Sequence, residues 1–90
     1  MTNWETFKKE LLKDKEVARE YERLKPKYML ISQIIGARIK KGLTQAELAK
    51  KVGTKQSAIA RVESGNANPS VSFLEKLAKA LGSKLIIQIQ

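Results

Sequence analysis

Cysteine and histidine are both absent from this sequence of 90 residues. Without cysteine the chain has no disulfide, no thiolate metal site and no thiol nucleophile. Without histidine it has no imidazole general base, no Ser–His–Asp triad and no ordinary zinc site. It also lacks a phosphate-binding loop, and Glu47, Glu63 and Glu75 are single carboxylates rather than a paired acid and base. We therefore expect a binding protein that is not an enzyme and that uses no cofactor or metal.

Long apolar runs are missing as well. No stretch approaches the roughly 18–20 residues that a membrane span needs, and the N-terminus has no apolar signal-peptide segment. Acidic residues are scarce after residue 30, because residues 31–90 hold 10 basic and 3 acidic side chains, whereas residues 1–30 hold 8 and 6. The net charge of +9 favours a polyanionic partner, with nucleic acid before a membrane. We expect a small cytoplasmic protein with one compact core.

The first 25 residues carry apolar side chains at helical spacing, which predicts two short helices joined near residues 14–15. A helix pair of this length is marginal in water unless its apolar stripe packs against something. The stripe either covers the rest of this chain or binds a partner, and the spacing alone leaves both open. Its residues are Trp4, Phe7, Leu11, Leu12, Val17, Tyr21 and Leu24.

Helix signals become sharper from Pro26 onward. Proline suits the first turn of a helix, so we expect a helix from Pro26 to Gly42 with an isoleucine stripe. Thr44 and Glu47 form a capping box that begins a second helix, and Thr54 is expected to cap a third over residues 55–64. The expected isoleucine stripe consists of Ile31, Ile34, Ile35 and Ile39.

The chain after residue 65 predicts one more helix and a strand. Ser70 or Ser72 caps a fourth helix that ends at Gly82, and the β-branched alternation of residues 84–90 is typical of a strand. We divide the chain into an N-terminal helical extension (1–25), a DNA-binding domain (26–82) and a terminal strand (83–90).

Residues 45–64 have the pattern of two short helices that cross closely. About three residues join them, so a small side chain is needed where the helices touch and a glycine is needed at the turn, and Ala49 and Gly53 meet these needs. Branched apolar residues fill the angle between the helices. This geometry is typical of a helix-turn-helix, whose second helix enters the major groove of DNA. The filling residues are Leu48, Val52, Ile59 and Val62.

The runs 42–49, 52–57 and 59–65 resemble the phage repressor/Cro family, the Xre-type helix-turn-helix proteins. The resemblance covers about residues 31–82 and implies an all-α domain of five to six helices, here with a short C-terminal β-strand. It also implies an internal ion pair between Arg38 and Glu63, which is a structural role rather than a DNA contact. It places Gln45 on a DNA phosphate, and the loop with Asn66 and Asn68 on the DNA backbone.

The exposed first turn of the third helix is expected to reach base edges. Gln56 can read adenine through its amide, Ser57 can donate or accept, and Lys55 or Arg61 can reach guanine or phosphate. For each polar residue, an ordinary solvated surface position is the alternative. The full set of predicted DNA-binding residues is Gln45, Thr54, Lys55, Gln56, Ser57, Ala60, Arg61, Asn66 and Asn68.

The whole chain has a narrower resemblance to HigA-type antitoxins. It is carried by the lead-in 12–17, by Tyr21, Leu24, Pro26 and Ile31, and by the ending 80–82 followed by a terminal strand. The resemblance implies a type II antitoxin that neutralises a RelE/HigB-like mRNase, binds an operator in double-stranded DNA and represses its own operon. A stand-alone Xre-type regulator is the alternative. Aromatic side chains suit a protein interface, so we expect Trp4, Phe7, Leu11 and Tyr21 to bind the toxin.

A homodimer is expected because one helix-turn-helix reads about half a site. An unpaired apolar edge strand promotes aggregation, and pairing with the same strand of a second copy would remove the exposed edge. We therefore expect the terminal strand to build the dimer, with folding back onto its own subunit as the alternative. The predicted dimer residues are Leu85, Ile86, Ile87 and Ile89.

Overall fold

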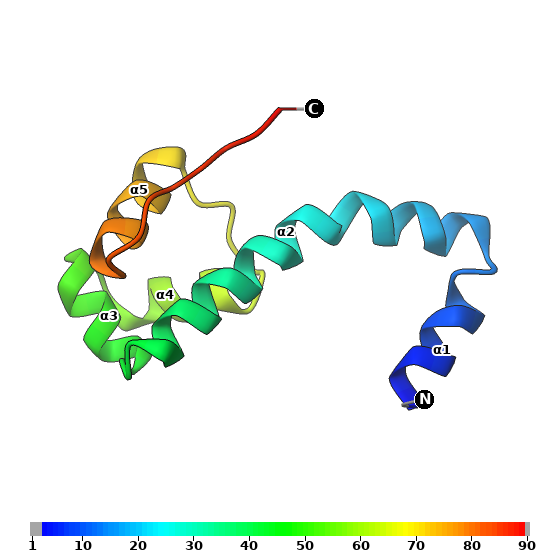
Figure 1. Ribbon diagram of the computed structural model, residues 1–90, viewed down its shortest axis with the longest axis horizontal. Helices are drawn as coiled ribbons and strands as arrows, with labels where there is room; N and C mark the ends of the chain where they lie inside the picture. Colours follow the sequence, from blue (N-terminus) through cyan, green and yellow to red (C-terminus); the bar gives the residue numbers. More distant parts are fainter. Residues whose placement is uncertain (1–2, 90) are drawn as a thin grey trace.

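The computed structural model describes residues 3–89 and consists of five helices (Figure 1). They are α1 (Asn3–Leu11), α2 (Lys15–Lys40), α3 (Gln45–Val52), α4 (Gln56–Glu63) and α5 (Val71–Ala80). The predicted all-α fold is confirmed. None of the described helices is long and apolar enough to cross a membrane.

Helix α2 is longer than the sequence suggests. Asp14 caps it by accepting hydrogen bonds from the backbone N–H groups of Glu16 and Val17, and the helix then continues for 26 residues with Pro26 inside it. The expectation that a helix begins at Pro26 is therefore wrong. Proline fixes φ at a helical value and removes one donor from the helix, and the cap at Asp14 and the apolar pattern on both sides continue the helix across it. The boundary at residue 26 thus falls within a helix, and the division of the chain into domains stays a prediction.

The core lies where the second half of α2 meets the three short helices. Leu48, Ile59 and Leu77 are the largest fully buried side chains, one each from α3, α4 and α5, and Ala49 and Val62 complete the contact between α3 and α4. Helix α2 contributes Ile34 to this cluster, and its Ile31 is buried as well. Ile39, the last residue of the expected isoleucine stripe, is instead exposed. We call residues 26–82 the head.

The first helix stands away from the head. Figure 1 shows α1 and the first turns of α2 projecting to one side, and we call residues 3–25 the arm. No residue of α1 is buried. The Trp4 and Phe7 rings lie 6.4 Å apart, and the Lys8 ammonium lies 4.7 Å from the centre of the Tyr21 ring on α2. The stripe therefore does not cover the core of the head, and that alternative is wrong.

The last segment, residues 83–89, follows the head without forming a strand, and we call it the tail. The Ser83 N–H donates to the Ala78 carbonyl (2.8 Å), and no backbone–backbone hydrogen bond involves residues 84–89 in the described part of the chain. Residues 84–89 therefore form no strand, because a strand needs a neighbouring strand and none lies in the part of the chain that the structure describes. Residues 84–89 do lie beside α2 and α5 of the same subunit, where Leu85, Ile86 and Gln88 line a groove, but they form no backbone hydrogen bonds there. Gln90 lies outside the described residues, as do Met1 and Thr2 of the N-terminal extension.

Candidate nucleic-acid interface

The start of α3 is held by the predicted capping box. The Thr44 hydroxyl accepts from the Glu47 N–H, and the Glu47 carboxylate accepts from the Thr44 N–H, both at 3.1 Å. These hydrogen bonds, first the one from the Thr44 backbone, lower the pKa of Glu47 below its ordinary value of 4.5. The box satisfies two of the free backbone groups at this helix end and so fixes where α3 begins.

This cap predicts a pH dependence of stability. Because the pKa of Glu47 is lower in the folded chain, its contribution is complete above about pH 4.5 and is lost as the pH falls through the folded value. We expect Glu47→Gln to lower the melting temperature at neutral pH and to have a smaller effect in acid, as measured by circular dichroism. In a Thr44→Ala background the effect of Glu47→Gln should be smaller but not lost, because the backbone N–H of residue 44 still donates to the carboxylate. An equal effect of Glu47→Gln at neutral and acid pH would contradict the role of the carboxylate.

The corner between α3 and α4 depends on Gly53. Its φ is +86°, and the N–H groups of Gly53 and Thr54 both donate to the Ala49 carbonyl at 2.9 Å. The expected cap at Thr54 is wrong. Lys55 is the N-cap of α4 and forms no side-chain capping bond, because a lysine ammonium has no acceptor for a backbone N–H. Gln56 and Ser57 consequently begin α4, with no side-chain cap over the first turn.

Arg38 and Glu63 form the predicted ion pair between α2 and the end of α4. Two bonds join them: Nε to Oε2 at 2.8 Å and Nη2 to Oε1 at 3.0 Å. Arg38 also donates from Nη1 to the Leu43 carbonyl at 2.9 Å. The hydrogen bond to Glu63 raises the pKa of Arg38. Both side chains are largely covered, with 16% and 5% exposed, so the pair ties α4 to α2 and to the α2–α3 turn.

Gln45 belongs to the same network, which the sequence did not indicate. Its amide Nε2 donates to Glu63 Oε1 at 3.2 Å. The side chain predicted to contact a phosphate is therefore half-buried and oriented by an acidic residue of α4. Gln45 and Glu63 are 18 residues apart in sequence, so no local pattern indicates their contact. They meet because the helix-turn-helix geometry brings the start of α3 beside the end of α4.

The predicted DNA-reading residues gather on α4 and at its two ends. Gln56 and Ala60, and likewise Ser57 and Arg61, are four residues apart and so lie on neighbouring parts of one helix face. The loop that follows α4 begins with the Asn66 N–H donating to the Arg61 carbonyl at 2.9 Å. Six of the nine residues are exposed, namely Lys55, Gln56, Ser57, Arg61, Asn66 and Asn68, while Gln45, Thr54 and Ala60 are half-buried. Their contacts with DNA stay a prediction.

A short helix packed across a second one, with its outer face exposed, defines a helix-turn-helix protein. Residues 34–87 match the helix-turn-helix family, and the chain belongs to it, in its Xre-type branch of DNA-binding regulators. A relative from Haemophilus influenzae, named as an uncharacterized HTH-type transcriptional regulator, is 34% identical over 96% of this chain and 84% of its own length. The multiprotein-bridging factor 1a of Arabidopsis thaliana is 46% identical over 58% of this chain, which spans about a third (37%) of that relative.

A solved structure is similar over nearly the whole chain. It is described as a toxin–antitoxin module from Streptococcus pneumoniae, with a TM-score of 0.58 and 29% sequence identity. The similarity covers 99% of this chain and 93% of the solved one. The match therefore includes the arm as well as the head.

Proposed function

We propose that this chain is the DNA-binding antitoxin of a type II toxin–antitoxin pair, which neutralises a RelE/HigB-like mRNase and represses its own operon. The main support is that the likeness to a toxin–antitoxin module extends over 99% of the chain, arm included. In this proposal the head binds the operator as part of a homodimer at the nucleoid, and the arm binds the toxin. The division of labour agrees with the structure, since the apolar face of the arm is not used to cover the head.

Base reading is proposed for the exposed first turn of α4. Gln56 can make a paired amide contact with adenine, and such contacts discriminate against a wrong base by about 1–3 kcal/mol. We expect Gln56→Ala to relax the base preference at one position, measured by selecting binding sites from random duplexes. Lys76→Ala on α5 is the control, because its side chain is also exposed but lies outside the predicted interface. An unchanged preference in Gln56→Ala would contradict the proposed contact.

The same binding should depend steeply on salt. Each phosphate that the head neutralises contributes about −0.9 to the slope of log K against log salt concentration. Lys55→Ala should therefore reduce this slope, whereas Gln56→Ala should leave the slope unchanged. Fluorescence anisotropy titrations over a salt series measure both. An affinity that does not change with salt would contradict DNA binding through the basic head.

A stand-alone Xre-type regulator is the second candidate. It is favoured by the Haemophilus influenzae relative, which is named as a transcriptional regulator and aligns with the arm as well as the head. A RelE-like reading frame of about 100 codons beside the gene would favour the antitoxin, since antitoxin and toxin genes are adjacent in the HigA-type group. Co-expression of that reading frame with this chain, followed by purification through the chain, tests the pairing directly.

A further inference from the structure

The loop that follows α4, residues 64–70, contains no basic side chain, although it is predicted to contact the DNA backbone. The loop begins where α4 ends, so the carbonyl groups of the last turn of that helix give this position a partial negative charge. A phosphate held there by the loop alone would face this charge without a compensating cation. A basic side chain from another element is therefore needed beside the loop.

Lys27 of α2 lies against the start of this loop. A Cβ atom at Gly65 would lie 4.0 Å from Lys27 Cε, the carbon that carries the ammonium group. It would lie 3.9 Å from Tyr28 Cε1 and 3.6 Å from Ile31 Cδ1, so this side of α2 packs on the loop backbone. Lys27 and Asn68 also line one cavity between α2 and the loop. Figure 1 shows the middle of α2 and the loop between α4 and α5 side by side.

The charge of Lys27 has no partner inside the described part of the chain. Lys27 takes part in none of the ion pairs found there. On α2, the residues one turn away on the same face are Arg23 and Leu24 before it and Leu30 and Ile31 after it, and none of them is acidic. A half-buried lysine covers its apolar stem and keeps its ammonium group in water. An ammonium group held in this way attracts an anion from outside the chain.

We propose that Lys27 binds the DNA backbone by neutralising a phosphate at the loop after α4. This inference rests on the DNA binding proposed above and extends it to a part of α2 outside residues 34–87, which match the family. The Asn66 N–H donates to the Arg61 carbonyl at 2.9 Å, so the start of the loop stays beside a residue already predicted to contact DNA. Because α2 continues through Pro26, the helix places Lys27 at the edge of that interface.

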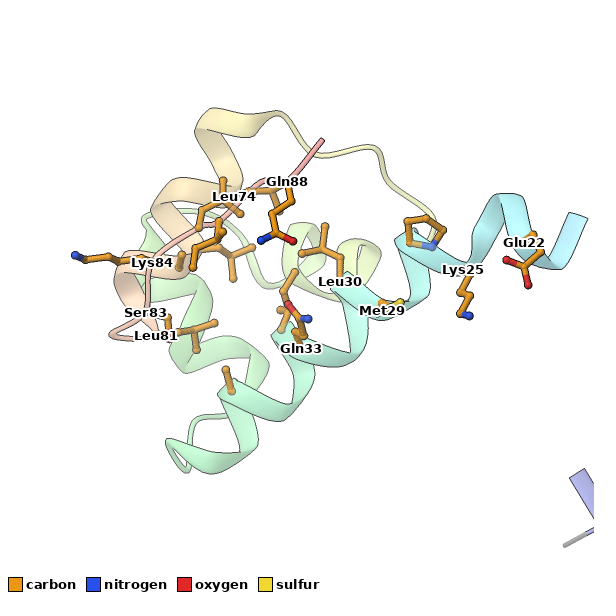
Figure 2. Close-up of a pocket in the computed structure, with 17 residues that line it drawn as sticks. Glu22, Lys25, Met29, Leu30, Gln33, Leu74, Leu81, Ser83, Lys84 and Gln88 are labelled. Carbon is orange, nitrogen blue, oxygen red and sulfur yellow. The ribbon is translucent and has the colours of Figure 1, made fainter. Parts of the chain in front are cut away.

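Lys25 is a matched control, because it is two residues from Lys27 on the same helix. Residues two apart on a helix do not face the same side. Lys25 lines the groove between α2, α5 and the tail, whereas Lys27 lines the cavity beside the loop (Figure 2). Replacing either lysine with glutamine removes one positive charge from the chain. A difference between the two variants therefore reports the position of the charge and not the net charge.

Salt titrations of the full chain, with a duplex selected from random DNA as the probe, test the proposal. Lys27→Gln should reduce the slope of log K against log salt concentration by about 0.9, the share of one phosphate, and weaken binding about 8-fold at ~0.1 M salt. Lys25→Gln should leave the slope nearly unchanged, and Lys27→Arg should retain it because the charge remains. Circular dichroism checks that each variant folds.

Neutral methylphosphonates, placed at one backbone position of the duplex at a time, identify the contact directly. At one position the substitution should weaken binding by the unaltered chain and by Lys25→Gln, but should have no further effect on Lys27→Gln. The absence of such a position would overturn the proposal, as would an unchanged slope in Lys27→Gln or equal losses in the two glutamine variants.

The proposed DNA binding itself has a different signature of failure. If the unaltered chain binds with a steep salt dependence that Lys55→Ala reduces and Lys27→Gln does not, the role of Lys27 is wrong and DNA binding by the head stands. If binding by the unaltered chain does not depend on salt, both proposals are overturned.

Discussion

Replacing Glu63 with alanine is expected to lower the free energy of unfolding by about 3 kcal/mol. Removing one partner of a buried ion pair typically costs about 3–5 kcal/mol, since the other charge is left without compensation. We take the lower end because 16% of the Arg38 side chain remains exposed. In a chain of this size the loss corresponds to a fall of roughly 12 °C or more in melting temperature. Urea and thermal unfolding followed by circular dichroism measure both quantities.

The arm provides a matched control for this prediction. Glu20 and Arg23 form the same type of pair at 2.7 Å, but their side chains are 62% and 67% exposed. Solvent screens an exposed pair and leaves it little net effect on stability, so Glu20→Ala should have little effect. Replacing Arg38 and Glu63 together with apolar residues should cost less than Glu63→Ala alone, because no unpaired charge remains. Equal effects of Glu63→Ala and Glu20→Ala would show that burial does not strengthen the role of the Arg38–Glu63 pair.

Replacing Trp4 and Phe7 together with alanine is expected to reduce the capture of a RelE/HigB-like toxin at least about 100-fold. Anchoring aromatic residues in protein interfaces cost about 2 kcal/mol or more each when truncated. Their rings lie 6.4 Å apart on one face of α1 and are 60% and 57% exposed, so they are free to enter a partner's surface. Isothermal titration or surface plasmon resonance with the purified toxin measures the loss.

An aromatic residue outside the arm controls for surface changes in general. Tyr28 of α2 is exposed to a similar extent but belongs to the head, and Tyr28→Ala should leave toxin capture intact. Affinity for a single operator half-site should be unchanged in the Trp4→Ala/Phe7→Ala variant, because the arm does not cover α4. Full capture by that variant would remove the two rings from the toxin interface, whereas a lack of capture by the unaltered chain would favour the stand-alone regulator.

Local signals predicted the head well. Thr44, Glu47 and Gly53 act within a few residues of their own positions, and each has the predicted role in a cap or a turn. The pairing of Arg38 with Glu63 was also foreseen, but through the family resemblance rather than through spacing. The buried positions Leu48 and Ile59 followed from the need for branched apolar residues between two closely crossing helices.

The errors arose where a local rule competes with its surroundings. Pro26 often marks a helix start, yet here the helix on both sides is strong enough to continue through it. The β-branched tail has the composition of a strand, but composition supplies no neighbouring strand. Thr54 has the side chain of a cap, but α4 begins at Gln56, so Lys55 and not Thr54 occupies the N-cap position. The contact between Gln45 and Glu63 depends on the crossing of two helices, which no single segment specifies.

Helix α2 is one unbroken helix that joins the arm to the head. At a rise of about 1.5 Å per residue its 26 residues span roughly 39 Å, and Arg38 near its C-terminal end binds Glu63 at the end of α4. In the proposed complex, a toxin bound by α1 would therefore lie at the opposite end of α2 from the base-reading helix α4.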